Sequence, residues 1–282
     1  MTEERQNAGE GGKSGQLKIF FGYAAGVGKT YAMLQAALMA EERGMDVVIG
    51  SIAPYRSLED TALAERLRAM ERLEKFDLDQ AIRRKPDLIL MDDLACENPR
   101  GSRHSRRYQD IRELLKAGIS VYTTVSAQNI ESLNDIVTAI TRVPVKDRIP
   151  DSVFDHADQV ELVDLEPREL LERLRNGALA EKEGEQTPET AYFAVASLTA
   201  LREVALRRCA DRINMLTRGD GAAHGDEHVL VCLSASPSNA KIVRTAARMA
   251  NAFRGAFTAL FVKTPDLAYM DQEDRKRLQS HM

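Results

Sequence analysis

Residues 21–30 read Phe-Gly-Tyr-Ala-Ala-Gly-Val-Gly-Lys-Thr and lie between an apolar run and a stretch with helical spacing. Glycines let backbone N–H groups converge on an anion, and a helix N-terminus favours negative charge. Lys29 adds a cation for terminal phosphates, and the hydroxyl of Thr30 is suited to ligating Mg²⁺. The segment predicts a loop that binds a nucleoside triphosphate, with contacts from Gly22, Ala25, Gly26, Val27, Gly28, Lys29, Thr30 and Tyr31.

This loop departs from the usual spacing G-x-x-x-x-G-K-[ST]. The position five before Gly28 is Tyr23, and the leading glycine stands one residue earlier, at Gly22. The alternative is a glycine-rich turn that holds no ligand. The order of strand, loop, Lys-Thr and helix favours the phosphate-binding interpretation.

Two carboxylates follow a second apolar run. Residues 88–91 are Leu-Ile-Leu-Met, and Asp92 and Asp93 come next. Such a segment holds hydrated Mg²⁺ and orients an attacking group, so the metal ligands expected beside the nucleotide are Thr30 and Asp92. Asp93 stands where many ATPases have a glutamate and is one methylene shorter. For Asp93 a helix cap or an exposed acid remains an equal alternative.

Two further segments carry polar groups toward the same region. Residues 99–110 contain four arginines and a histidine, which suit phosphate or an acidic partner. A solvated basic surface is the competing interpretation. Thr124 ends the strand expected next and is a candidate sensor of the terminal phosphate, whereas capping a helix explains Asn129 equally well.

Strands alternate with helices along most of the chain. Strands are expected over residues 17–21, 46–52, 86–93, 119–125 and 159–165, and helices over 30–43, 58–73, 105–117, 130–141 and 167–174. This alternation predicts an α/β fold of the P-loop NTPase type, with a mainly parallel sheet and helices on both faces. Ligands of such sheets lie at the carboxyl ends of the strands, where the glycine-rich loop belongs.

The second part of the chain has its own pattern. We predict a flexible tail over residues 1–15, a nucleotide-binding domain over 16–178 and a linker with a long helix over 179–226. Residues 227–282 then start a partial second α/β unit, with strands over 228–233 and 257–262 around a helix over 241–251.

Composition narrows the class of protein. With 282 residues, 44% of them hydrophobic, the chain can form a packed core, and its net charge of −4 gives no basic field for nucleic acid. Three widely spaced cysteines argue against a disulfide framework or a zinc site. No apolar run approaches the roughly 20 residues of a membrane helix, and the polar N-terminus has no signal region. We expect a soluble, cytoplasmic chain with no membrane segment.

Taken together, these motifs are similar to the N-terminal cytoplasmic region of the KdpD potassium sensor kinases. The resemblance runs from about residue 17 to 212 and includes blocks beyond the loop, among them residues 101–110, 114–118, 121–124, 131–135, 150–153 and 200–208. It implies a regulatory ATP-binding domain followed by a universal-stress-protein-like domain. In full-length members these precede membrane helices and a histidine kinase, which this chain lacks.

The resemblance also implies a second ligand and shows departures. Some members are thought to bind cyclic di-AMP, which here would involve Ser234, Ser236, Phe257 and Thr258. The usual Asp-Glu-Leu-Ala-His-Thr-Asn is Asp-Asp-Leu-Ala-Cys-Glu-Asn at residues 92–98, and the usual Asn-Val-Gln-His is Ser-Ala-Gln-Asn at 126–129. These changes weaken the expectation of ATP turnover more than that of ATP binding.

The function expected is a regulatory module that binds ATP and Mg²⁺. It would pass the bound state to a histidine kinase core or a response regulator of a two-component system controlling potassium transport. The alternatives are a P-loop ATPase or small-molecule kinase with its own turnover, and an interaction scaffold with a vestigial loop.

Overall fold

The structure is a computed structural model. It describes residues 14–52, 66, 70–73, 76–177, 194–217, 228–253, 255–262 and 270–281. The chain divides into two compact units, Met1–Leu206 and Arg207–Met282. Each contains a parallel sheet with helices, which confirms the α/β class.

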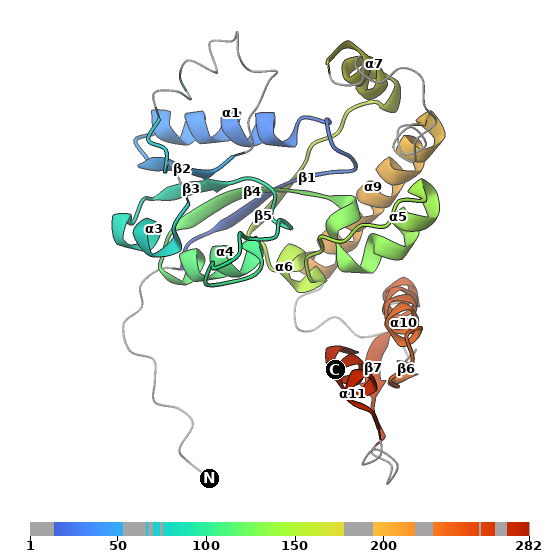
Figure 1. Ribbon diagram of the computed structural model, residues 1–282. Coiled ribbons are helices and arrows are strands. Elements are labelled where there is room, and N and C mark those ends of the chain that lie inside the picture. The colour runs from blue at the N-terminus through green and yellow to red at the C-terminus, as the bar shows by residue number, and fades with distance from the viewer. Residues whose placement is uncertain are drawn as a thin grey trace, which may run out of the picture. The chain divides into compact units, whose positions relative to one another are not determined.

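The first unit is built on a five-stranded sheet (Figure 1). In order across the sheet, the strands are β2 (Val47–Ser51), β3 (Leu88–Met91), β4 (Ser120–Ser126), β1 (Leu17–Gly22) and β5 (Gln159–Leu162). All the pairings are parallel, with Leu17 opposite Val121 and Lys18 opposite Gln159. The carboxyl ends of the strands therefore share one edge, where ligands of such sheets bind.

Helices cover both faces of this sheet, as expected. In Figure 1, α1 (Lys29–Glu42) lies on one face, and α3 (Leu78–Arg84) and α4 (Arg107–Lys116) lie on the other. The first unit also contains α5 (Asn134–Thr141), α6 (Asp151–Asp155), α7 (Pro167–Gly177) and two 3₁₀ turns, η2 (Ala127–Asn129) and η3 (Glu131–Leu133).

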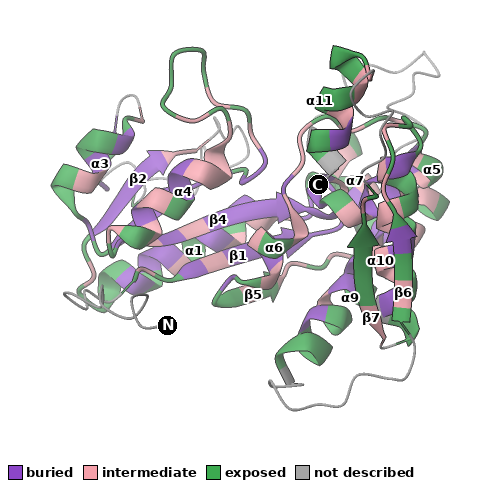
Figure 2. Ribbon diagram, turned by 90° about the horizontal axis from the view of Figure 1, so that it is seen from below, coloured by how far each residue is buried: buried purple, intermediate pink, exposed green. Residues whose placement is uncertain are grey.

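The core of the first unit lies between α1 and the sheet. Helical spacing places Met33, Leu34, Ala37 and Leu38 on one side of α1, where they are buried against strand residues such as Phe20. On β3 all four residues are buried, which is typical of a strand covered on both faces. Figure 2 shows this burial in the central strands.

The predicted strands are all present with small shifts at their ends, but three features differ from the expectation. Residues 70–73, predicted as the end of a helix, are extended, because Ile49 of β2 donates to Glu71 and accepts from Leu73 through the backbone. Most of the remainder of that helix lies outside the described residues. The helix expected over 130–141 begins as 3₁₀ turns, and α3, α6 and α11 (Gln272–His281) were not predicted.

The second unit contains a two-stranded parallel sheet. β6 (His228–Cys232) pairs with β7 (Ala256–Leu260), and α10 (Asn239–Phe253) connects them. The helix α9 (Val195–Thr217) runs through the division between the two units. The domain boundaries predicted near residues 178 and 226 fall outside the described residues.

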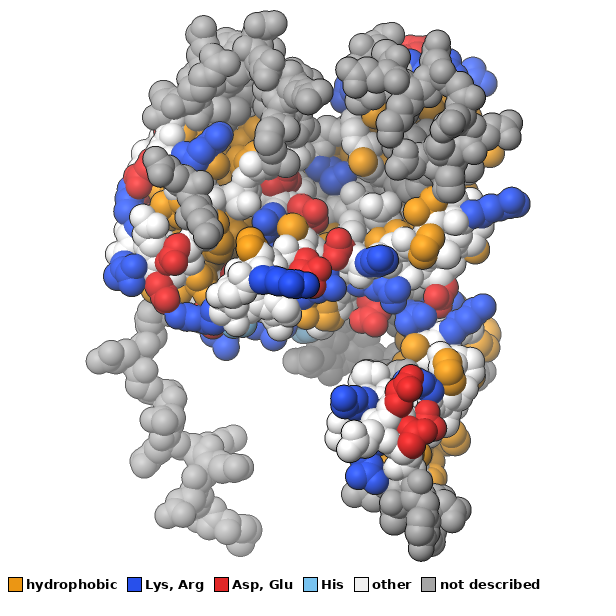
Figure 3. All heavy atoms as spheres, in the orientation of Figure 1, with side chains coloured by type: hydrophobic (Ala, Val, Ile, Leu, Met, Phe, Trp, Pro, Cys, Tyr) orange, Lys and Arg blue, Asp and Glu red, His pale blue; other side chains and the backbone are white. Residues whose placement is uncertain are grey.

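Charge is mixed on the molecular surface. On the face seen in Figure 3, Lys and Arg side chains alternate with Asp and Glu among the atoms that are coloured. All three cysteines are free thiols. The free thiols agree with the expectation that the cysteines form no disulfide framework.

Candidate functional site

The glycine-rich loop connects β1 to α1 at the carboxyl edge of the sheet. Gly26 and Gly28 have φ angles of 85° and 105°, a region that side chains rarely adopt, and Gly28 is the N-cap of α1. A Cβ atom on Gly22 would lie 2.6 Å from Cγ2 of Val27, so the loop closes tightly there. Ala25 is exposed at the tip. The N-cap of α1 has no side-chain hydrogen bond, which leaves the first backbone N–H groups of the helix available to an anion.

Lys29 is folded back onto the loop. Its ammonium group donates to the carbonyl of Ala24 at 2.8 Å. Burial lowers the pKa of Lys29 to about 8, and the charges of Asp92 and Asp93 partly oppose that shift. The lysine is therefore positioned beside both carboxylates and can exchange a carbonyl partner for a phosphate.

A buried hydrogen-bond cluster joins the loop to β3 and β4. The hydroxyl of Thr30 donates to the carboxylate of Asp92 at 3.1 and 3.2 Å, and the hydroxyl of Thr124 donates to Asp92 Oδ1 at 2.6 Å. Asp92 is 6% exposed. The structure thus brings together Thr30, Asp92 and Thr124, although Thr124 orients the carboxylate, a role that the sequence did not suggest.

The oxygens of Thr30 and Asp92 fit a magnesium ion. Mg²⁺ prefers hard oxygen ligands and is usually held by one or two protein groups together with phosphates and water. Among the described residues, no group of three or more His, Cys, Asp or Glu side chains could hold a metal ion. A metal at this site would depend on the phosphates of a nucleotide.

Asp93 has an unusual backbone and a capped carboxylate. Its φ angle is 56°, and its N–H group lies 3.1 Å from the hydroxyl oxygen of Thr124. One carboxylate oxygen accepts from the N–H of Ala95 at 3.3 Å, so a local cap is present. Partial desolvation raises the pKa of the Asp93 carboxyl, while nearby Arg107 opposes the shift.

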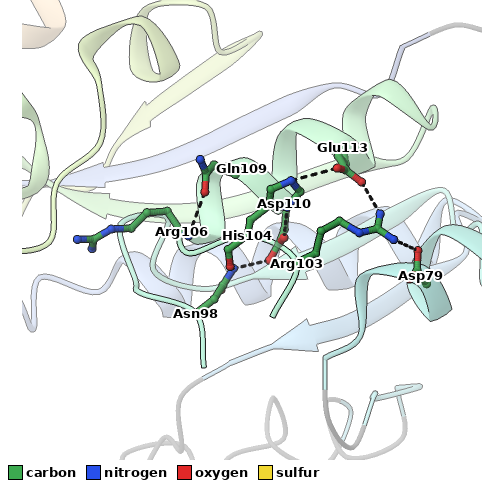
Figure 4. A network of polar contacts seen from close by, with 8 residues as sticks. All are labelled: Asp79, Asn98, Arg103, His104, Arg106, Gln109, Asp110 and Glu113. Atoms are coloured by element: carbon green, nitrogen blue, oxygen red, sulfur yellow. Dashed lines mark hydrogen bonds and ion pairs between the residues drawn. The ribbon is translucent and has the colours of Figure 1, made fainter. Parts of the chain in front are cut away.

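The arginine-rich loop before α4, residues 99–106, is held by carboxylates of neighbouring helices (Figure 4). Arg103 forms ion pairs with Asp79 at 2.5 Å and with Glu113 at 2.8 Å. His104 contacts Asp110 at 2.8 Å through Nδ1 and Glu113 at 3.1 Å through Nε2. These contacts fix the loop against α3 and α4.

Two further arginines of this segment, Arg106 and Arg107, also have protein partners. Arg106 pairs with Asp147 at 2.6 Å, and Arg107 donates to the backbone carbonyls of Asp92 and Asp93. Arg103 is exposed, as the solvated-surface interpretation expects, whereas Arg106 and Arg107 are half-buried and have protein partners. Their main contacts support the structure behind the two carboxylates.

Two predicted loop contacts point elsewhere. Val27 is 3% exposed and belongs to the core. Tyr31 is 41% exposed, and its hydroxyl accepts a hydrogen bond from Gln35 at 3.1 Å on the outer side of α1. Their side chains do not join the Thr30–Asp92 cluster, although their backbone N–H groups belong to the loop and the first turn.

The segment after β5 was not part of the predicted site, yet it touches the loop. The Tyr23 hydroxyl donates to the carbonyl of Leu165 at 2.8 Å, and burial raises the pKa of Tyr23 to about 12. An ideal Cβ atom on Gly26 would lie 3.1 Å from Leu174 and 3.2 Å from Leu170, both on α7. The sequence predicted a helix over residues 167–174, which α7 confirms, but it did not indicate that this helix packs on the loop.

The residues predicted to contact cyclic di-AMP are in the second unit. Ser234 lies 3.3 Å from Oδ1 of Asn239 through its hydroxyl, and the hydroxyl of Ser236 is 2.9 Å from that of Ser238. Thr258 contacts the ring of His228 at 2.7 Å. Because side chains alternate along a strand, Phe257 and Thr258 point to opposite faces of β7. The four residues therefore do not share one face.

Comparison with known proteins identifies a family. The family model described as "Osmosensitive K+ channel His kinase sensor domain" matches residues 13–213. The sensor protein KdpD of Clostridium acetobutylicum is 48% identical over 89% of this chain and 30% of its own length. The sensor protein KdpD of Escherichia coli is 40% identical over 94% of this chain and 32% of its own length. A putative sensor protein KdpD of Synechocystis is 37% identical over 89% of this chain and 71% of its own length.

The chain therefore spans about a third of the length of the first two relatives. A solved structure described as a DNA replication initiation factor aligns with a TM-score of 0.31 at 16% identity, covering 73% of this chain and 58% of that one. A score this low carries no functional argument. None of the helices within the described ranges is long and apolar enough to cross a membrane.

Proposed function

Because the chain belongs to the KdpD family of sensor proteins, we propose that its first unit binds ATP with Mg²⁺ as a regulatory part of a two-component system controlling potassium transport. The observation that carries this proposal is the hydrogen bond between Thr30 and Asp92 at the edge of the sheet. This bond joins the glycine-rich loop to the carboxylate segment after β3. The oxygens of Thr30 and Asp92 are 3.1 Å apart, close enough for both to bind one magnesium ion. Lys29 and the N-terminus of α1 supply positive charge beside it.

The geometry favours regulation over turnover. Asp93 follows Asp92 in the position where many ATPases have their base, and its carboxylate already accepts a hydrogen bond from the N–H of Ala95. A bound nucleotide would contact segments that also support the loop after β3. Its terminal phosphate can therefore change the surface offered to a partner.

The partners follow from the family. We propose a histidine kinase core or a response regulator as the recipient of the signal, since the relatives are sensor proteins. A P-loop ATPase or small-molecule kinase remains the alternative. Cyclic di-AMP binding in the second unit stays a prediction from the resemblance, with the hydroxyls of Ser234 and Ser236 as its candidate contacts.

Calorimetric titration with ATP and Mg²⁺ tests this function. The Lys29→Ala variant removes the buried cation, while Lys116→Ala, on the exposed last turn of α4, serves as a matched loss of one lysine. We expect the wild-type chain and Lys116→Ala to bind ATP equally and Lys29→Ala to lose binding. Phosphate release is followed in the same samples and should be negligible.

The outcomes separate the alternatives. Steady phosphate release that depends on Lys29 would make the chain an enzyme. Absence of ATP binding by the wild-type chain would refute the proposal and favour a scaffold.

A further inference from the structure

The helix α7 lies directly over the glycine-rich loop. Leu170 and Leu174 approach Gly26 so closely that a Cβ atom there would meet them at 3.2 and 3.1 Å. The same helix places the guanidinium of Arg173 over the next glycine, with Nη1 at 3.7 Å from the position of a Cβ atom on Gly28. Arg173 therefore reaches the N-cap of α1, where a polyphosphate would bind.

Arg173 is exposed and adds a positive charge at this position. The N-terminus of α1 carries a partial positive charge. Lys29, the residue after the N-cap, adds the positive charge of its ammonium group. Within the described ranges, no carboxylate pairs with Arg173, not even Glu169 one turn earlier on α7, whereas Arg103, Arg106 and Arg202 each have carboxylate partners. Asp92 and Asp93 offset part of the charge of Lys29, so the exposed guanidinium of Arg173 is the cation of this cluster that an incoming anion can pair with.

We propose that Arg173 is a ligand of the nucleotide's polyphosphate and that α7 is the element that reads the bound nucleotide. This inference rests on the proposed function of the loop. Arg173 of α7 would then be the arginine that contacts the phosphates of the nucleotide, because Arg103, Arg106 and Arg107 already have protein partners. A guanidinium donates in a planar fork, which matches the geometry of phosphate oxygens.

The surroundings of α7 give its position a consequence. The segment that leads into it holds Tyr23 through the carbonyl of Leu165 and holds Arg202 of α9 through Asp164 and Glu166, both at 2.6 Å. A phosphate that holds α7 in place through Arg173 would therefore also favour one position of α9, because Arg202 is paired with the segment that leads into α7. That gives the bound state a physical route out of the loop.

Two matched variants test this role. Arg173→Gln removes the guanidinium that lies over Gly28, and Arg175→Gln makes the same change two residues later on the same helix, where the arginine is equally exposed. Affinities are measured for ATP and for inorganic tripolyphosphate, which has no base or sugar. We expect Arg173→Gln to weaken both about 10- to 100-fold, the worth of one hydrogen bond between charged groups, and Arg175→Gln to change neither by more than about twofold.

Further measurements separate a ligand from a structural role. Thermal unfolding without nucleotide should be the same for Arg173→Gln and Arg175→Gln, and Arg173→Lys should recover part of the affinity as a point charge. If wild-type chain binds ATP and Lys29→Ala does not, but Arg173→Gln binds like Arg175→Gln, the role of Arg173 is refuted and the proposed function stands. If wild-type chain binds neither ATP nor tripolyphosphate, both fail.

Discussion

At the residue scale, two neighbouring threonines of β4 have opposite surroundings. Thr124 donates to Asp92 at 2.6 Å, while the hydroxyl of Thr123 is fully buried and has no hydrogen-bond partner in the part of the chain that is described. Burying an unpaired hydroxyl costs free energy, whereas a hydrogen bond to a carboxylate stabilises the fold.

Valine substitutions at these positions should therefore have opposite effects. We expect Thr124→Val to lower the free energy of unfolding by about 1.5 to 3 kcal/mol, because Asp92 loses a charged hydrogen bond. Thr123→Val, which keeps the shape, should be neutral or stabilising. Urea denaturation of both variants measures the difference, and equal losses at the two positions would contradict this account.

The lowered pKa of Lys29 predicts a pH dependence of stability. Its folded pKa is about 8, below the ordinary value of 10.5. Above pH 8 the folded chain releases a proton that the unfolded chain keeps, so stability rises with pH through this group. Below pH 8 both states hold the proton, and Lys29 contributes no slope.

The measurement compares wild-type chain with Lys29→Met between pH 7 and 9.5. We expect the free energy of unfolding of the wild-type chain, relative to the variant, to be flat up to about pH 8 and then to increase. The pH range ends at 9.5, below the range in which tyrosines titrate. The pKa of Tyr23 is raised, so its titration would lower stability as the pH rises and oppose the effect of Lys29. A flat or decreasing difference above pH 8 would mean that burial does not lower the pKa of Lys29 in the folded chain.

At the scale of elements, substitutions at two glycines separate the energetic effect of packing α7 on the loop from the effect of backbone conformation. Gly26 and Gly44 both have a φ angle of 85°, but a Cβ atom on Gly44 would contact nothing within 4 Å. We expect Gly44→Ala to cost about 1 to 2 kcal/mol for the backbone conformation alone.

Gly26→Ala should cost about 1 to 3 kcal/mol more, because Leu170 and Leu174 must move. Thermal unfolding gives the comparison. Equal costs for the two substitutions would show that α7 does not press on the loop in solution.

Sequence reasoning found the elements with strong periodicity and missed those without it. β3 was predictable because four apolar residues precede two aspartates, and α1 because its apolar spacing begins after a glycine-rich loop. α3 and α11 are short and polar, and residues 70–73 follow helical spacing but pair with β2 instead.

The candidate site divides in the same way. The expected proximity of Thr30 and Asp92 follows from strand order and was predictable. The contacts of Arg103 with Asp79, and of α7 with Gly26, join segments far apart in the sequence. No local pattern encodes which distant carboxylate an arginine will meet.

At the scale of the whole molecule, the two units differ in how they are covered. β1 and β4 are central strands with buried side chains, whereas β7 is mostly exposed and pairs only with β6 among the described strands (Figure 2). Leu230 is 57% exposed and Val262 60%. Two-stranded sheets are marginally stable in water.

Amide hydrogen exchange should therefore distinguish the units. We expect the amides of β1 and β4 to exchange only through unfolding of the first unit, and those of β6 and β7 to exchange at least tenfold faster through local opening. Protection of β6 equal to that of β4 in the isolated chain would contradict this difference.

The order of strands also has a consequence for synthesis. β1 is flanked by β4 and β5, so Leu17 meets its partner Val121 only after about 100 further residues have been made. At typical translation rates this takes roughly 5 to 20 seconds. During that time the apolar strand that carries the glycine-rich loop has neither neighbour, so it is open to association with other chains until β4 and β5 have been made.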